Sequence, residues 1–198
     1  MTSSTAAEPW PLRTERLEIR RCVPADLDAV WAYRRLPEVN RWLGRAPATR
    51  AAFHETYSDP ERLATTFVIV RREPGKDPVI VGDLMVRVED GWAQAEVVDA
   101  ARGTQAELGW VLDPAHAGRG YATEAVRAVI DACFGPLGLR RVHAGCFAAN
   151  EPSWRLMERI GMRREEHSRR TALHRSGEWM DGMDYAVLAE DWPTAPPR

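Results

Sequence analysis

Apolar residues alternate with polar ones in several short stretches of the chain, and this period of two predicts β-strands. The run Arg16 to Arg21, for example, sets Leu17 and Ile19 against charged neighbours. Strands are expected at residues 16–21, 67–70, 79–88, 107–112, 141–147 and 184–188, with a further strand at 92–98 and a turn region at 179–182.

Helices are predicted where apolar residues recur every three to four positions. The clearest spans residues 122–134, where an apolar stripe precedes the helix-ending pair Gly135-Pro136. A helix over residues 151–160 follows from Asn150 as N-cap and Gly161 just past its end. Two earlier helices are expected at 25–34 and 50–57. This order of elements predicts an α+β fold with mixed α/β layers, in place of a doubly wound one.

Length and composition fit one domain. The chain has 198 residues, 44% hydrophobic and 28% charged, and no linker divides it. We expect a single domain at 12–192, between flexible tails at 1–11 and 193–198 that are rich in small residues and proline. The formal net charge is −2, so nothing favours nucleic acid or an anionic membrane as partner.

The cysteines and the N-terminus indicate the cellular compartment and whether a metal site is expected. Three cysteines lie far apart, at positions 22, 133 and 146, without the spacing of a zinc site or a disulfide framework. We therefore expect no metal, and free thiols fit a reducing cytoplasm. The start of the chain has neither the basic nor the apolar region of a secretory signal.

The segment that carries chemistry runs from Ala106 to Ala125. A strand leads into a loop with Gly118 and Gly120, and this loop opens the helix at 122–134. Glycines allow close approach of backbone N–H groups, and a helix N-terminus favours negative charge, so the loop suits a pyrophosphate. A Walker loop is excluded, and a dinucleotide-binding turn would need glycine in place of Thr123. A loop that merely caps the helix is the alternative.

Four ordered motifs resemble the GNAT N-acetyltransferases. The run Gly118-Arg119-Gly120-Tyr121-Ala122-Thr123-Glu124-Ala125, after Glu107-Leu108-Gly109-Trp110-Val111-Leu112, is similar to that family's acyl-coenzyme A signature. The segment Asn150 to Met162 resembles its Asn-x-x-Ser…Gly-Phe segment. The opening at 12–20 and the close at 174–181 resemble the ribosomal-protein-alanine acetyltransferase branch. The resemblance covers roughly residues 12–192.

The resemblance implies a central mixed sheet with helices on both faces, in which two parallel strands, at 107–112 and 141–147, splay apart around acetyl-CoA as cosubstrate. Residues implied to hold its pantetheine arm and sulfur are Trp110, Val111, Leu112, Asn150 and Ser153. Those implied to hold its pyrophosphate are Ala117, Gly118, Arg119, Gly120, Tyr121, Ala122 and Thr123. Ala117 departs from the family pattern, which has Gln or Arg there and uses it to cradle phosphate.

Direct transfer to an amine needs a base and a group that stabilises the leaving thiolate. By the resemblance, Glu107 is the general base, acting through water, and Ser153 donates to the thiolate. Many relatives have a Tyr four residues later, where this chain has Met157. The alternatives are that Glu107 is a salt-bridged strand residue and that Ser153 is a helix hydroxyl without a proton role.

The sequence gives less information about acceptor binding than about donor binding. The family places its acceptor cleft beside the N-terminal helices, which implicates Trp31, Asn40 and Trp42, and His174 precedes the last strand. Each is also explained by packing or surface exposure. The branch favours a protein N-terminal α-amine, while a small amine or an antibiotic is the alternative. A non-catalytic acyl-CoA-binding module remains open, and a homodimer is expected because related proteins often pair.

Overall fold

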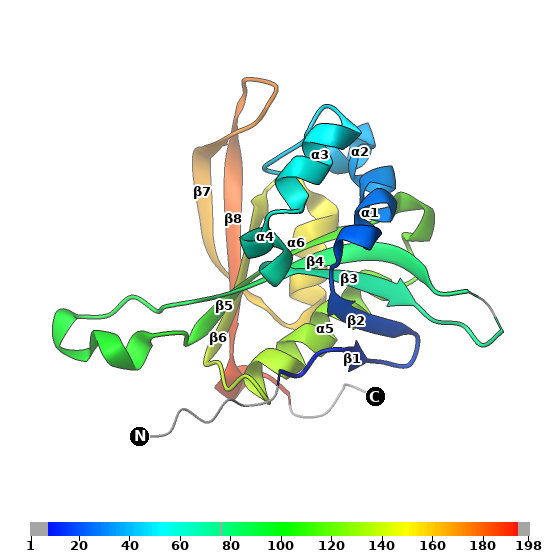
Figure 1. Ribbon diagram of the computed structural model, residues 1–198. Coiled ribbons are helices and arrows are strands. Elements are labelled where there is room, and N and C mark those ends of the chain that lie inside the picture. The colour runs from blue at the N-terminus through cyan, green and yellow to red at the C-terminus, as the bar shows by residue number, and fades with distance from the viewer. Residues whose placement is uncertain (1–7, 76, 194–198) are drawn as a thin grey trace.

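One mixed sheet organises the chain in the computed structural model, which describes residues 8–75 and 77–193 (Figure 1). Its eight strands lie in the order β1-β2-β3-β4-β5-β6-β8-β7. All neighbouring strands are antiparallel except β5 and β6, which are parallel. The strands are β1 (Leu12–Arg13), β2 (Leu17–Arg21), β3 (Thr66–Arg71), β4 (Val79–Glu89), β5 (Gln105–Leu112), β6 (Arg141–Phe147), β7 (Arg163–Leu173) and β8 (Trp179–Leu188).

Helices come early and late in the chain. The early group is α1 (Leu27–Arg34), α2 (Pro37–Asn40), α3 (Arg50–Tyr57) and α4 (Pro60–Thr65). The late helices are α5 (Tyr121–Phe134) and α6 (Glu151–Ile160). Short 3₁₀ turns complete the set: η1 (Pro24–Asp26), η2 (Ala95–Ala101), η3 (Pro114–His116) and η4 (Ala189–Asp191).

The sheet separates two hydrophobic cores, because successive side chains of a strand point to opposite faces. Along β3, Phe67 and Ile69 pack into the core that α5 and α6 share. Val68 and Val70 pack into the other core, with residues of α1 and α3. Helices therefore cover both faces, and the predicted α+β fold is confirmed.

A buried ion pair attaches the early helices to the sheet. Asp83 of β4 is 1% exposed, and its carboxylate accepts hydrogen bonds from Arg34 and from the Tyr33 hydroxyl, the latter at 2.6 Å. Arg34 also donates to the Tyr57 hydroxyl at 2.7 Å. Burial by itself would lower the pKa of Arg34, but the Asp83 carboxylate overrides it, so the net shift is upward. This network joins α1 and α3 to the strand beside β5.

Two sequence predictions were wrong. Residues 92–98 form a loop and part of η2, not a strand, and Trp92, Val97 and Val98 stay exposed on a connection that projects from the body (Figure 1). Residues 179–182, expected as a turn, belong to β8 and pair with β7 and β6. At 179–182, pairing with neighbouring strands overrode the local turn signals, whereas no pairing with another described strand involves residues 92–98.

The expected tails lie partly outside the described residues. In the described part of the N-terminal segment, Trp10 packs on Phe67 with ring centroids 4.0 Å apart, and Arg21 donates to the Glu8 carboxylate at 2.6 Å. Near the other end, Trp192 is buried, and its indole N–H donates to Asp131 of α5 at 2.6 Å. Glu8, Trp10 and Trp192 thus contact the rest of the domain.

Candidate active site

The two parallel strands of the sheet separate after a short shared stretch. Pairing between β5 and β6 is restricted to Gln105 with Arg141, Ala106 with Val142 and Glu107 with His143. Beyond that vertex β5 continues along β4 as far as Leu112, whereas β6 continues along β8 as far as Phe147. Within the described residues, the inner edges of both strands have no strand partner beyond the vertex, and such backbone groups need hydrogen bonds from elsewhere.

Backbone direction shows which groups of β5 face the opening. The amide of Asp113 donates to the Val81 carbonyl of β4 at 2.9 Å. Since alternate residues of a strand direct their N–H and C=O groups to opposite neighbours, Val111 also faces β4, and Trp110 and Leu112 face the gap. The backbone of these two residues is therefore available to an extended ligand lying between β5 and β6.

The glycine loop lies directly after β5. Gly118 (φ 73°) and Gly120 (φ 80°) are left-handed, and Gly120 is the N-cap of α5 without a side-chain hydrogen bond. The first amide of this region with an acceptor in the described structure is that of Glu124, bonded to the Gly120 carbonyl at 3.0 Å. The amides of residues 118–123 thus remain open at the positive end of a 14-residue helix, which fits a diphosphate.

Side chains and backbone of the N-terminal segment hold this loop in place. Glu124 accepts hydrogen bonds from the Thr14 hydroxyl (2.5 Å), the Arg16 amide (3.1 Å) and Arg16 Nε (2.7 Å). The Arg16 guanidinium also donates to the Arg119 carbonyl at 3.0 Å and lies over the Tyr121 ring, 4.8 Å from its centroid. Carbonyl and carboxylate groups are engaged behind the loop, while its amides stay free.

The side chains expected to hold the pyrophosphate divide into two groups. Tyr121 is 6% exposed beneath Arg16, so its side chain belongs to the core and only its backbone is available. Arg119 is exposed at the loop, and Arg159 of α6 reaches the Thr123 hydroxyl at 3.4 Å. Sequence reasoning missed Arg16 and Arg159, because both come from distant segments.

Glu107 lies at the vertex where β5 and β6 separate, on the sheet face shared with α1 and α3. Arg87 of β4 forms an ion pair with its carboxylate. Beside it, His143 Nε2 lies 2.7 Å from Glu89 Oε1. The alternative that Glu107 is salt-bridged is therefore true of this geometry, and the paired carboxylate is held next to the opening.

Asn150 and Ser153 begin α6 at the far end of β6. The Ser153 amide donates to the Asn150 carbonyl at 3.1 Å, and Asn150 makes no side-chain cap hydrogen bond. Neither the Asn150 amide group nor the Ser153 hydroxyl has a hydrogen-bond partner within the described part of the chain. Both polar groups are available at the end of β6.

The proposed acceptor residues do not all meet. Trp42 and His174 do, with ring centroids 6.1 Å apart, and Phe147 of β6 lies within 6.0 Å of Trp42 and 5.6 Å of His174. His174 Nε2 lies 2.8 Å from the Arg41 carbonyl, which joins the β7–β8 hairpin to the segment after α2. Trp31 packs instead on Phe53, and the side-chain amide of Asn40 donates to the Arg35 carbonyl at 3.4 Å.

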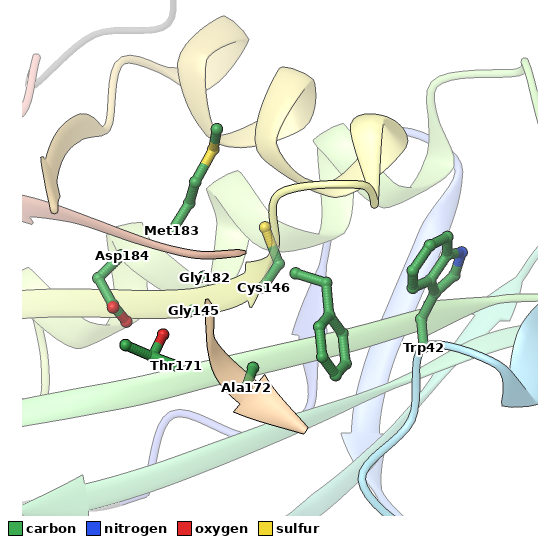
Figure 2. A pocket seen from close by; sticks show the side chains of 9 residues that line it. Trp42, Gly145, Cys146, Thr171, Ala172, Gly182, Met183 and Asp184 are labelled. Atoms are coloured by element: carbon green, nitrogen blue, oxygen red, sulfur yellow. The ribbon is translucent and has the colours of Figure 1, made fainter. Parts of the chain in front are cut away.

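A cavity of about 310 Å³ opens beside this aromatic cluster. Figure 2 shows Trp42 at one end and Asp184 with Thr171 at the other. Its lining is drawn from the segment after α2 and from strands β6, β7 and β8: Trp42, Gly145, Cys146, Phe147, Thr171, Ala172, Gly182, Met183 and Asp184. Sequence reasoning missed all of these except Trp42.

Cys146 raises the question of covalent chemistry, since it lines the cavity. Burial, together with the negative charge of Asp184, raises the pKa of the Cys146 thiol to about 11. A thiol with so high a pKa is almost entirely protonated at neutral pH and is a poor nucleophile. Cys22, Cys133 and Cys146 are all free thiols.

Within residues 8–75 and 77–193, no group of three or more His, Cys, Asp or Glu side chains could hold a metal ion. No helix in the same part of the chain has the length and apolar character needed to span a bilayer.

Comparisons with known proteins agree with this geometry. A family model described as "Acetyltransferase (GNAT) domain" matches residues 16–163, well over half of the chain. A relative, the uncharacterized N-acetyltransferase YnaD of Bacillus subtilis, is 41% identical over 86 residues, which cover 43% of this chain. The match spans only 50% of YnaD's own length.

Solved structures share the whole architecture. A GNAT-family acetyltransferase from Bacillus anthracis superposes with a TM-score of 0.75 at 30% identity, over 90% of this chain and 98% of that one. Mycobacterium smegmatis RimJ, in a complex with CoA-disulfide, has the same fold with a TM-score of 0.71 at 21% identity, over 94% and 91% of the two chains.

Proposed function

The chain belongs to the GNAT family of acetyltransferases, and from this membership we propose that it is an acyl-CoA-dependent N-acyltransferase. It would transfer an acetyl group, or a longer acyl group, from acyl-CoA to a primary amine. One observation carries the proposal: the bare edges of β5 and β6 open beside six free amides at residues 118–123. A strand-like arm ending in a diphosphate fits both features at once.

The donor would be held largely by backbone. The amides at 118–123 receive the diphosphate, with Arg119 and Arg159 as nearby cations. The gap-facing backbone of Trp110 and Leu112 receives the pantetheine amides, and Asn150 offers its side chain from the other wall. Support comes from the structural neighbour RimJ, which was solved in complex with CoA-disulfide.

The donor, when bound, supplies an activated acyl carbonyl and a sulfur leaving group. Glu107 takes the proton of the incoming amine, through water, from its place at the vertex. Arg87 forms an ion pair with this carboxylate, and the acceptor must compete with that pair. The Ser153 hydroxyl, free of partners in the described structure, donates to the departing sulfur, and a gap-facing N–H of β5 polarises the carbonyl.

Direct transfer is favoured over a route through an acyl-cysteine. Cys146 is the one cysteine that lines the cavity described above, and its pKa of about 11 leaves little thiolate to attack a thioester. Cys22 and Cys133 are buried, and burial raises the pKa of each to about 12.

We place the acceptor in the aromatic cavity. Of the four residues that the sequence implied for acceptor binding, only two lie beside this cavity. Trp42 and His174 flank it, whereas Trp31 and Asn40 are not among the residues that line it. A protein N-terminal α-amine is the branch's substrate class and remains our proposal alongside small amines. We also retain a cytoplasmic location and a homodimer as proposals, since the thiols are free and Trp92 is 91% exposed on the projecting connection.

An acceptor screen tests the proposal. Release of free thiol from acetyl-CoA is followed with N-terminal peptides and small amines, and the acylated product is identified by mass. Thiol release that depends on an amine supports the transferase. Tight acetyl-CoA binding without release for any amine would instead indicate a non-catalytic acyl-CoA-binding module.

A further inference from the structure

An unpaired carboxylate stands at one end of the aromatic cavity. Asp184 of β8 is exposed and has no hydrogen bond or ion pair with any residue in the described structure. A Cβ on Gly145 would lie 2.7 Å from Asp184 Oδ1, so the carboxylate lies across the backbone of β6 where that residue has no side chain. The glycine makes room for the acid at the cavity wall.

The basic side chains that β6 places on this sheet face are already engaged. Arg141 donates to Glu165 at 2.6 and 2.8 Å, and His143 is bonded to Glu89. Glu166 of β7 stands opposite Asp184 in the strand register. Partial desolvation raises the pKa of Asp184, and the neighbouring charge of Glu166 raises it further, while His143 lowers it.

The other end of the cavity is aromatic. The rings of Trp42 and Phe147 lie 6.0 Å apart, centroid to centroid, and present apolar surface toward an entering group. Arg41 already stacks on one face of Trp42, 4.3 Å from the centroid, so this ring binds a cation within the protein. An apolar wall leading to an unpaired acid suits an alkyl chain that ends in a positive charge.

The cavity is also at a useful distance from the proposed base. Glu107 and Asp184 lie on the same sheet face, separated by two residues along the strands and by two strand spacings through β6. Strand geometry places their Cα atoms roughly 12 Å apart. An acceptor amine at Glu107 could therefore carry a second nitrogen about 6–9 Å away and reach Asp184 with it.

We propose that the cavity selects amine acceptors that carry a second positive charge, which binds Asp184 while the first nitrogen is acylated. This inference rests on the proposed acyl transfer and adds the substrate class. The shared chemistry is a dication, which a small diamine or a peptide with a basic side chain could supply.

The test compares acceptors that differ only in the second charge. Acetyl-CoA turnover is measured with 1,5-diaminopentane and with pentylamine, for the wild type, Asp184→Asn and the matched control Asp191→Asn in η4. We expect the wild type to prefer the diamine in kcat/KM, and Asp184→Asn to lower that preference about five- to tenfold. The control should keep the wild-type preference. An equal preference in wild type and Asp184→Asn would overturn the inference.

Binding measured without turnover separates this inference from the proposed function. Titration calorimetry follows 1,5-diaminopentane binding to each variant in the presence of coenzyme A. Binding weakened by Asp184→Asn, with no turnover for any amine, would refute the transferase and retain the cavity. Amine-dependent turnover, together with diamine binding that Asp184→Asn leaves unaffected, would support the transferase and refute the role of the cavity. Gly145→Ala, which must displace the carboxylate, is expected to act like Asp184→Asn.

A peptide pair identifies the source of the dication. Ala-Lys-amide and Ala-norleucine-amide differ by the side-chain charge alone. An Asp184-dependent preference for the lysine peptide indicates a basic peptide substrate. The same preference confined to the diamine pair indicates a small diamine, and its absence from both pairs contradicts the inference. Thermal unfolding checks that Asp184→Asn is folded, since removing an unpaired acid beside Glu166 should not lower its Tm.

Discussion

The donor side and the acceptor side of the candidate site offer different kinds of chemical group to a ligand. The donor side, between β5 and α5, offers backbone: gap-facing amides of the strand and open amides at residues 118–123. The acceptor side, around Trp42, Phe147 and Asp184, offers side chains gathered from four separate segments. Backbone recognition tolerates changes of most side chains but not of glycines, whereas side-chain recognition can be altered one residue at a time. Glu107 stands at the vertex between the two.

The largest expected effect comes from the vertex. Glu107→Gln removes the proposed base, and kcat should fall about 10²- to 10⁴-fold with little change in KM for acetyl-CoA. Steady-state kinetics across pH measure it, with the exposed Glu61→Gln of α4 as a control for the charge change. Full kcat at every pH would show that Glu107 is only the ion-pair partner of Arg87.

Glycine replacement tests whether the donor side depends on backbone. Gly118 and Gly138 both have positive φ, and a Cβ on either would meet nothing within 4 Å, so alanine strains only the backbone. Both variants should lose about 1–2 kcal/mol of stability. Gly118→Ala alone should also raise KM for acetyl-CoA, by about tenfold. Equal KM values for the two variants would place the donor away from the loop.

Ser153→Ala tests the proposed hydrogen bond from Ser153 to the departing sulfur. Loss of one hydrogen bond to a developing thiolate should lower kcat about tenfold, while KM for acetyl-CoA changes little. The control is Ser58→Ala, an exposed position after α3. An unchanged kcat would assign Ser153 to the first turn of α6 without a role in proton transfer.

The smallest effect concerns Cys146 and its coupling to the acceptor side. Because its pKa is raised to about 11, the alkylation rate should be low at pH 7.5 and should still be rising at pH 10. Asp184 contributes to that raised value, so Asp184→Asn should lower the pKa and speed alkylation at a given pH. Mass-resolved iodoacetamide labelling measures both rates. Rapid labelling at neutral pH would reopen the acyl-cysteine route.

Much of the donor side could be predicted from the sequence, because its determinants are local. The strand at 141–147 and the helix at 151–160 have the predicted bounds, and α5 starts one residue before its prediction. Glycine pattern and helix caps act over a few residues, so a single segment contains the whole signal.

The acceptor side could not be predicted in the same way. Most residues of β7 are exposed and charged, so its sequence lacks the alternation of a half-buried strand, and α2, at four residues, is too short for a helical period. The cavity depends on where β7 and β8 place Thr171, Gly182 and Asp184 relative to Trp42. Only the assembled sheet brings these positions together, and for the same reason the sequence does not reveal that Trp31 packs on Phe53 and is not among the residues that line the cavity.

A crystal structure with bound coenzyme A tests the central claim most directly. The account predicts that the diphosphate accepts hydrogen bonds from the amides of residues 118–123 and that the pantetheine arm runs between β5 and β6. A diphosphate bound away from this loop, or an arm that leaves the gap between the two strands empty, would contradict it.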